Sequence, residues 1–172
     1  DRVVAPTSLG FNWLNEARRF APTLKVRLFG SGDRDAVFKK LGSRDVVVVS
    51  YGLLTREKER FHAVQWSSVI LDEAQAIKNK DTNRWRAVSN LQGDFRLILT
   101  GTPIENHLGE LWSLFQFINP GLLGSRKEFQ ERFIVPIERD RHHEARSHLK
   151  RLIRPFILRR TKAQVLEELP SR

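Results

Sequence analysis

The sequence predicts an α/β fold, in which a parallel sheet is covered by helices and followed by a purely helical part. Short apolar runs alternate with amphipathic stretches through the N-terminal part, which is typical of strand–helix repeats. The β-branched run Val46–Val49 suits a strand buried on both faces, as central parallel strands are. After Pro103 the pattern changes, and only helices and loops are expected.

Five apolar runs have the length and composition of strands. Pro6 breaks the first run, and Gly30–Gly32 closes the second. Two acidic residues follow the fourth run directly, and a Thr-Gly-Thr turn follows the fifth. The expected strands are Val3–Ala5, Leu24–Phe29, Val46–Val49, Trp66–Leu71 and Phe95–Leu99.

Apolar residues recur at helical spacing between these runs. The first helix is expected to begin near Leu9, with Thr7 or Ser8 available as its N-cap. A later helix ends at Asn119-Pro120-Gly121. The other expected helices are Asp33–Leu41, Gly52–Val64, Arg84–Leu91 and Leu108–Ile118.

Two parts are expected, an α/β body over residues 1–118 and a helical extension over residues 119–172. In the extension, an apolar stripe that includes Leu149 and Ile153 lies opposite basic residues. Between Arg146 and Lys162 there are seven basic residues and no acidic one. Such a run is typical of a solvated helical face. A phosphate-facing surface becomes the better interpretation only if other features indicate nucleic acid.

Composition narrows the class of partner. The chain has 172 residues and a net charge of +10, from 30 Lys and Arg against 20 Asp and Glu, which favours polyanions. Cysteine is absent, so disulfides, thiol nucleophiles and thiolate metal sites are excluded, and an intracellular protein is expected. No apolar run approaches the roughly 18 residues of a membrane span, and no membrane partner is expected.

The most informative segment is the apolar run that ends in Asp72 and Glu73. Ligands bind open α/β sheets at the carboxyl ends of the strands. There, one carboxylate can hold Mg²⁺ while the next polarises an attacking water, as nucleoside triphosphate hydrolysis requires. Alone, the pair would more often begin a loop or cap a helix.

Three other strand ends carry small polar residues. Thr100-Gly101-Thr102 follows one strand, Pro6-Thr7-Ser8 another, and Ser50-Tyr51 a third. Each could be an ordinary turn or helix cap. Together with Asp72 they would line one edge of the sheet, where hydroxyls and helix-start amides can contact phosphates. This convergence outweighs the separate structural interpretations.

Five segments, in this order and spacing, resemble the SWI/SNF-type ATPase family of helicase superfamily two, and are most similar to its bacterial members. They are APTSLGFNW, VVSYGLL, WSSVILDEAQAIKN, LILTGTPIENHLGELWSLFQFINPGLLG and RPFILRRTKAQVLEELP. The resemblance spans nearly the whole chain, and the segment Leu99–Gly124 is its most specific part. It implies a RecA-like first motor lobe with a helical protrusion.

The resemblance also implies roles for the residues at the strand ends. Asp72 would serve the Mg²⁺–ATP complex and Glu73 would activate the hydrolytic water. Gln75, with Thr100, Gly101 and Thr102, would couple the ATP site to DNA. The residues matching the two DNA-backbone motifs are Pro6, Thr7, Ser8, Ser50 and Tyr51. The intact protein would be a DNA-stimulated ATPase that tracks duplex DNA without separating its strands, in the nucleoid or cytoplasm of a bacterium or the nucleus of a eukaryote.

Two parts of the family pattern are expected outside the chain. No G-x-x-x-x-G-K-S/T loop occurs, so the phosphate-binding loop is expected upstream of Asp1 and the second lobe beyond Arg172. The chain alone is therefore expected to lack ATP hydrolysis. The strand preceding that loop would lie beside Phe95–Leu99, so an exposed sheet edge, marginal stability or self-association is expected.

Several other residues are expected to have structural rather than functional roles. Arg159, Arg160 and Lys162 are expected to link the lobes rather than bind DNA. Trp13 and the other tryptophans fall at core positions, so packing is favoured over base stacking. Two alternatives for function stay open, another superfamily-two motor and a regulatory nucleic-acid-binding module without ATPase activity.

Overall fold

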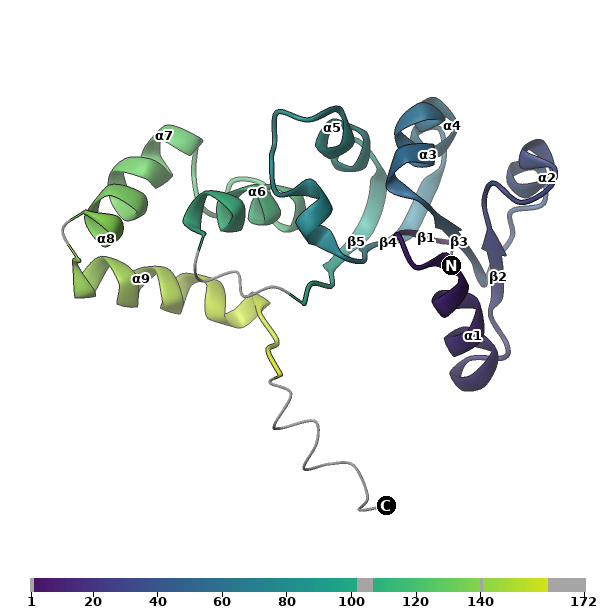
Figure 1. The fold of residues 1–172 in the computed structure, drawn as a ribbon, viewed down its shortest axis with the longest axis horizontal. Coiled ribbons are helices and arrows are strands. Elements are labelled where there is room, and N and C mark those ends of the chain that lie inside the picture. The colour runs from purple at the N-terminus through teal and green to yellow at the C-terminus, as the bar shows by residue number, and fades with distance from the viewer. Residues whose placement is uncertain (1, 102–106, 140, 161–172) are drawn as a thin grey trace, which may run out of the picture. The chain divides into compact units, whose positions relative to one another are not determined.

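Every strand of the described residues lies in one parallel sheet. The computed structural model describes residues 2–101, 107–139 and 141–160. In this part of the chain five strands pair in the order β2-β3-β1-β4-β5, and every pairing is parallel (Figure 1). The predicted α/β fold is confirmed. The strands are β1 (Val3–Pro6), β2 (Lys25–Leu28), β3 (Asp45–Val49), β4 (Gln65–Leu71) and β5 (Gln92–Ile98).

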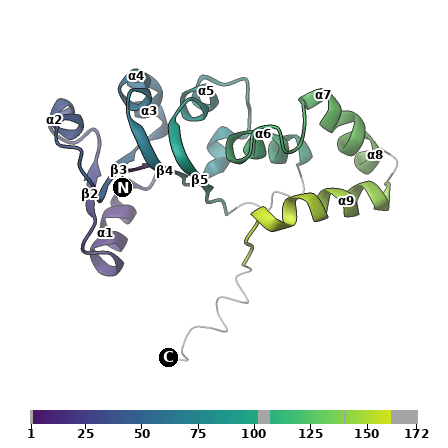
Figure 2. The same cartoon turned by 180° about the vertical axis from the view of Figure 1, so that it is seen from behind.

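Helices lie on both faces of this sheet. The first helix covers one face, and the helices that follow β3 and β4 cover the other, as Figures 1 and 2 show from opposite sides. In the described residues no helix has the length and apolarity to cross a membrane. The helical elements here are α1 (Gly10–Phe20), α2 (Arg34–Lys39), α3 (Tyr51–Arg56), α4 (Lys58–His62), the 3₁₀ turn η1 (Ala74–Ile77), α5 (Asn83–Ser89) and α6 (Leu108–Ile118).

The single helix predicted over Gly52–Val64 is wrong, because the chain divides it at Glu57 into α3 and α4. Glu57 has φ −105° and ψ 21°, outside the helical range. Its carboxylate lies 2.8 Å from Arg34 Nη1 and 3.2 Å from Arg60 Nε. Arg34 belongs to the preceding helix, so this contact could not be read from the local apolar pattern.

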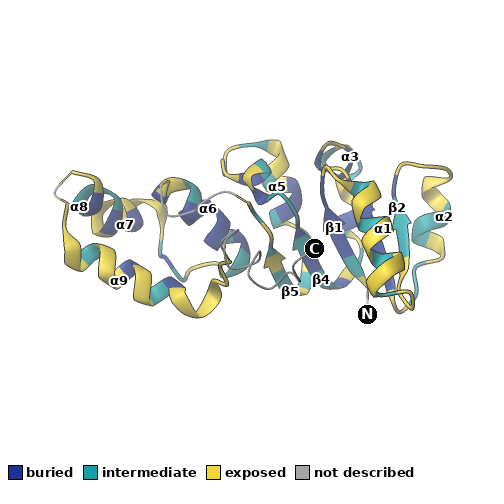
Figure 3. Cartoon of the chain, turned by 60° about the horizontal axis from the view of Figure 1, so that its bottom comes forward, coloured by how far each residue is buried: buried dark blue, intermediate teal, exposed yellow. Residues whose placement is uncertain are grey.

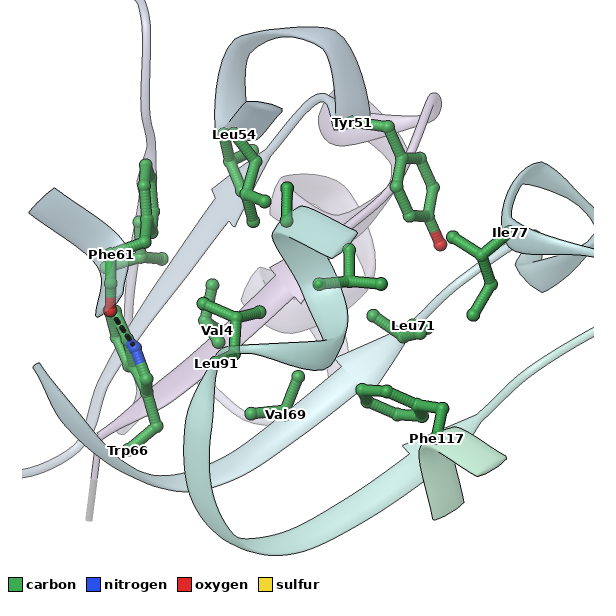
Figure 4. Close-up of a cluster of buried hydrophobic side chains, with 14 of the residues drawn as sticks. Val4, Tyr51, Leu54, Phe61, Trp66, Val69, Leu71, Ile77, Leu91 and Phe117 are labelled. Atoms are coloured by element: carbon green, nitrogen blue, oxygen red, sulfur yellow. Dashed lines mark hydrogen bonds between the residues drawn. The ribbon is translucent and has the colours of Figure 1, made fainter. Parts of the chain in front are cut away.

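The larger core lies between the sheet and helices α3 to α6 (Figure 4). Val47 and Val69 contribute from the central strands, and both are fully buried. Trp66 fills the base of the cluster, where its indole N–H donates to the Phe61 carbonyl at 3.0 Å. A smaller cluster on the opposite face joins Ala5, Val46 and Val48 to side chains that include Trp13 of α1. The sheet is thus held from both sides at β1 and β3.

Strand β5 packs on one side through Arg96. Its guanidinium lies 4.8 Å from the centroid of the Phe117 ring and donates to the carbonyls of Ser89, Leu91 and Phe117. The Ser89 and Phe117 carbonyls lie in the last turns of α5 and α6, where a cation complements the helix dipoles. Burial lowers the pKa of Arg96, because removal from water disfavours the charged form of the guanidinium.

On the opposite face of the sheet, the apolar side chains of β5 are exposed. Phe95, Leu97 and Leu99 alternate along it and are 57%, 38% and 41% exposed (Figure 3). The register places Phe95 beside Ser68 and Leu97 beside Ile70, so these side chains share the face that α1 covers elsewhere. Within the described residues β5 pairs with β4 alone. β5 is therefore an edge of the sheet in the described part of the chain.

A second compact unit follows the α/β body. The two units are residues 1–124 and 125–172, so the first extends beyond α6 and beyond the expected boundary at residue 118. The reason is local, because Trp112 Nε1 and Gln116 Nε2 both donate to the Gly124 carbonyl, at 3.1 and 3.2 Å. The described part of the second unit is helical. It contains α7 (Arg126–Phe129), the π-helical turn η3 (Gln130–Ile134), α8 (Val135–Glu138), α9 (His143–Ile153) and η4 (Arg154–Phe156).

The second unit buries the apolar side of its helices. A capping box of Ser125 and Glu128 begins α7. The ring of Phe133 meets those of Phe129 and His148, with centroids 5.4 and 5.6 Å apart. Leu149 is buried on α9, while the basic residues of that helix are exposed.

The open face of β5 predicts unequal effects of two leucine substitutions in the 172-residue chain. Leu97→Gln should change the free energy of unfolding by less than about 1 kcal/mol, because much of the side chain already contacts water. Leu71→Ala, at a fully buried position of β4, should cost about 2–5 kcal/mol. Urea unfolding of monomer at low concentration measures both. Equal losses would show that the face is covered in solution.

Candidate nucleotide and nucleic-acid site

Four strand ends meet at one edge of the sheet. Pro6 pairs with Val49 and Leu71 with Ile98, so β1, β3, β4 and β5 end in register. Main-chain hydrogen bonds continue past these ends, from Asp72 N to Pro6 O at 3.0 Å and from Ala74 N to Leu99 O at 3.0 Å. The residues that follow the strands are therefore brought together, as the sequence predicted.

The carboxylate of Asp72 is the centre of this edge. The Thr7 hydroxyl and the Trp13 indole N–H both donate to Oδ2, each at 3.0 Å. The Glu73 amide donates to Oδ1 at 2.9 Å. Three donors to one carboxylate fix its orientation.

Tyr51 reaches the same residue from α3. Its hydroxyl donates to the Asp72 carbonyl at 2.6 Å, and its side chain is buried. Burial and the negative charges of Asp72 and Glu73 raise the pKa of Tyr51 above its ordinary value, although Arg84 acts in the opposite sense. The phenol is therefore a proton donor at any physiological pH.

Glu73 has a strained backbone. Its φ of 50° and ψ of 52° lie in the left-handed region, which a residue with a Cβ enters at a cost of about 1–2 kcal/mol. The strained turn aims the Glu73 amide at Asp72. No described residue forms a hydrogen bond or ion pair with the Glu73 carboxylate, which is only partly exposed. Strain at such a position is a property of functional sites.

The segments after β4 and β5 approach each other at their polar ends. Thr100 Oγ1 lies 3.4 Å from Gln75 Oε1, which is long for a hydroxyl–amide hydrogen bond. Gly101 is exposed beside them. Thr102, the third predicted coupling residue of this turn, lies outside the described residues.

The residues predicted to contact DNA divide into an inner and an outer set. Pro6, Thr7 and Tyr51 are buried, and the two hydroxyls are bonded to Asp72. Ser8 and Ser50 are exposed. Ser50 also caps α3, where its Oγ accepts from the Leu53 amide.

The N-cap predicted at Thr7 or Ser8 is wrong. Helix α1 begins at Gly10 with Leu9 as N-cap and no side-chain cap. The Thr7 hydroxyl instead accepts from the Leu9 amide at 3.0 Å and donates to Asp72. The Thr7 hydroxyl therefore bonds to the Asp72 carboxylate, which is distant in sequence, instead of capping α1.

The contacts of Asp72 fit a magnesium site. An ionised carboxylate offers about four lone-pair directions, and three donors occupy two on Oδ2 and one on Oδ1. One direction of Oδ1 remains for a cation or its bound water. No group of three or more acidic or histidine side chains clusters in the described residues. Mg²⁺ with ATP does not need one, since substrate phosphates and water supply most of its ligands.

Trp13 is the residue of this site that sequence reasoning missed. It was assigned to packing, and its ring does pack against the smaller core cluster. The usable signal was its position in the first turn of a helix that follows a strand end, because such turns face the ligand edge of the sheet. Arg159 and Arg160 are exposed, and Lys162 lies outside the described residues.

The sequence profile of the SNF2-related domain matches residues 2–172. The chain belongs to the SNF2-related domain family. A solved relative, the Sulfolobus solfataricus SWI2/SNF2 ATPase core in complex with dsDNA, superposes on 94% of this SNF2-related chain with a TM-score of 0.83 and 43% identity. The chain covers 34% of that structure.

Curated relatives of this SNF2-related chain come from bacteria and eukaryotes. YwqA of Bacillus subtilis, a candidate ATP-dependent helicase/translocase, is 44% identical over 99% of the chain. The TATA-binding protein-associated factor mot1 of Schizosaccharomyces pombe is 38% identical over 99% of it. The chain spans 19% of the first relative and 9% of the second. The resemblance expected from the sequence motifs is confirmed.

The strained backbone predicts that glycine is favoured at position 73. Glu73→Gly should leave the chain about 1 kcal/mol more stable than Glu73→Ala, because glycine adopts left-handed torsion angles without a Cβ clash. Both variants remove the carboxylate, so their difference isolates the backbone. Equal midpoints and slopes in urea unfolding would contradict the strain.

Proposed function

We propose that the intact protein is an ATPase that moves along duplex DNA, and that this chain supplies the hydrolytic part of its first RecA-like lobe. The Asp72–Glu73 pair carries the proposal. One carboxylate accepts hydrogen bonds from three donors, and the next has no described partner and lies at the same sheet edge. Family membership and the likeness to an ATPase core in complex with dsDNA support it.

The two carboxylates have different tasks in this proposal. Asp72 would hold Mg²⁺ or its bound water through Oδ1, while Thr7 and Trp13 hold Oδ2. Glu73 accepts the proton of the attacking water, which it can reach because no described residue binds its carboxylate. Bound Mg²⁺ would neutralise phosphate charge during transfer. The left-handed backbone of Glu73 gives its side chain a different direction from that of Asp72.

DNA contact is assigned to the exposed turns beside this pair. Ser8 and Ser50 follow β1 and β3 and can donate to backbone phosphates. Pro6, Thr7 and Tyr51 support these turns from inside. Gln75, Thr100, Gly101 and Thr102 would couple the nucleotide state to them, and the approach of Thr100 to Gln75 supports that role. A protein acting on DNA would be intracellular.

The chain is proposed to need further segments for turnover. It contains no phosphate-binding loop of the G-x-x-x-x-G-K-S/T type, and arginines of a second lobe would complete the phosphate site. The exposed apolar side chains of β5 also support the need for further segments. An adjoining strand and its helix would cover Phe95, Leu97 and Leu99. Alone at high concentration, the chain is expected to associate through this face.

ATP turnover by the full-length gene product tests the proposal. Wild type should hydrolyse ATP faster with duplex DNA, and Glu73→Gln should reduce the stimulated rate at least about a hundredfold, because the water loses its base. Glu59→Gln, an exposed acid of α4, is the matched control. The 172-residue chain should show no turnover that Glu73→Gln abolishes.

Other outcomes would replace the proposal. Full-length protein without turnover, but with salt-sensitive DNA binding, would indicate a regulatory binding module. Separation of DNA or RNA strands would indicate another superfamily-two motor.

Binding that depends on backbone phosphates predicts a steep response to salt. The affinity of the full-length protein for duplex DNA should fall as salt rises and should change little with base sequence. Ser8→Glu and Ser50→Glu should each weaken binding about tenfold or more by placing a negative charge against the phosphates. Ser31→Glu, in an exposed turn after β2, is the control. Fluorescence anisotropy at two salt concentrations measures all four proteins, and equal affinities would remove these turns from the interface.

A further inference from the structure

The carboxylate of Asp72 is tied to both ends of one short segment. Thr7 begins this segment directly after β1, and Trp13 ends it in the first turn of α1. Both donate to Oδ2 of Asp72 at 3.0 Å. Ser8 lies between them and is exposed. Ser8, which is assigned to DNA contact, thus lies in sequence between Thr7 and Trp13, the two donors to the Asp72 carboxylate.

Hydrogen bonds make the segment a continuous unit. The Trp13 amide donates to the Leu9 carbonyl at 3.4 Å, and the Leu9 amide donates to the Thr7 hydroxyl at 3.0 Å. That hydroxyl in turn donates to Asp72. A shift of the turn at Ser8 therefore moves both donors together.

The indole of Trp13 differs from the other indoles of the chain. Trp66, Trp85 and Trp112 each donate to a main-chain carbonyl, as buried indoles commonly do. Trp13 donates to a carboxylate at the ligand edge. Packing alone would be served by phenylalanine, so the N–H carries the distinguishing contact.

We propose that Thr7 and Trp13 are positioning residues that orient Asp72 toward magnesium and transmit DNA contact at Ser8 to that carboxylate. The inference rests on the proposed ATPase function and deepens it. With Oδ2 held by two donors and one position of Oδ1 held by Glu73, a single lone-pair direction of Oδ1 would be left to hold the cation. Removing one of the two donors leaves Oδ2 with a single hydrogen bond and fixes the orientation of the carboxylate less tightly.

Trp13→Phe in the full-length protein tests this, with Trp112→Phe as the matched control that also removes one indole N–H. Binding of Mn²⁺ in the presence of a non-hydrolysable ATP analogue, followed by electron paramagnetic resonance, reports on the carboxylate without turnover. Trp13→Phe should raise the half-saturating Mn²⁺ concentration about tenfold, as loss of a group that orients a metal ligand does. Trp112→Phe should leave it unchanged.

A second measurement addresses transmission. Trp13→Phe should reduce the stimulation of ATP turnover by DNA while DNA affinity stays within about twofold of wild type, since Ser8 itself is kept. Thr7→Val, which removes the other donor with little change of shape, should shift both measurements in the same direction. If Trp13→Phe does not fold, the same two measurements on Thr7→Val test the inference.

The outcomes separate this inference from the proposed function. Wild type without nucleotide-dependent Mn²⁺ binding or DNA-stimulated turnover would end the proposed function. Wild type with both, and a Trp13→Phe variant indistinguishable from Trp112→Phe in both, would overturn the positioning role alone.

Discussion

The in-register parallel pairing of β1 between β3 and β4 is the constraint on which the site depends. β1 pairs with β3 at four positions and with β4 at two, and Val47 and Val69 beside it are fully buried. Parallel strands point their carboxyl ends the same way, so residues far apart in sequence reach one edge. The hydrogen bond from Asp72 N to Pro6 O continues this pairing beyond the strands. The position of the Asp72 carboxylate is therefore set by the pairing of the strands.

Asp72 illustrates how a sheet edge becomes a chemical site. Its side chain accepts from Thr7, Trp13 and Glu73, and its carbonyl accepts from Tyr51. Two of these donors lie just after β1 and β4, and the other two lie in α1 and α3. A charge in a partly buried position is stable only with such partners. Two hydroxyls thus hold Asp72 in place, that of Thr7 at the carboxylate and that of Tyr51 at the main-chain carbonyl.

Much of the fold was predictable because strand and helix patterns are local. The run Val46–Val49 and the acids after Leu71 identified a buried parallel sheet and its ligand edge. The break at Glu57 was not predictable, because its ion pair involves Arg34 of another helix. Neither was the role of Trp13, which looks apolar in sequence and acts through one N–H. The left-handed turn at Glu73 had no signal, since glutamate rarely adopts it.

The open side of β5 implies that stability is graded across the sheet. β3 is buried along its whole length, whereas three alternate side chains at β5 and its end remain in contact with water. Local opening needs the least free energy where few apolar groups are buried. The strand that leads to Thr100 is therefore less protected against local opening than β3. Order in the turn at Thr100 would then depend on neighbours that cover this strand, whereas the Asp72 carboxylate keeps its donors from the buried centre.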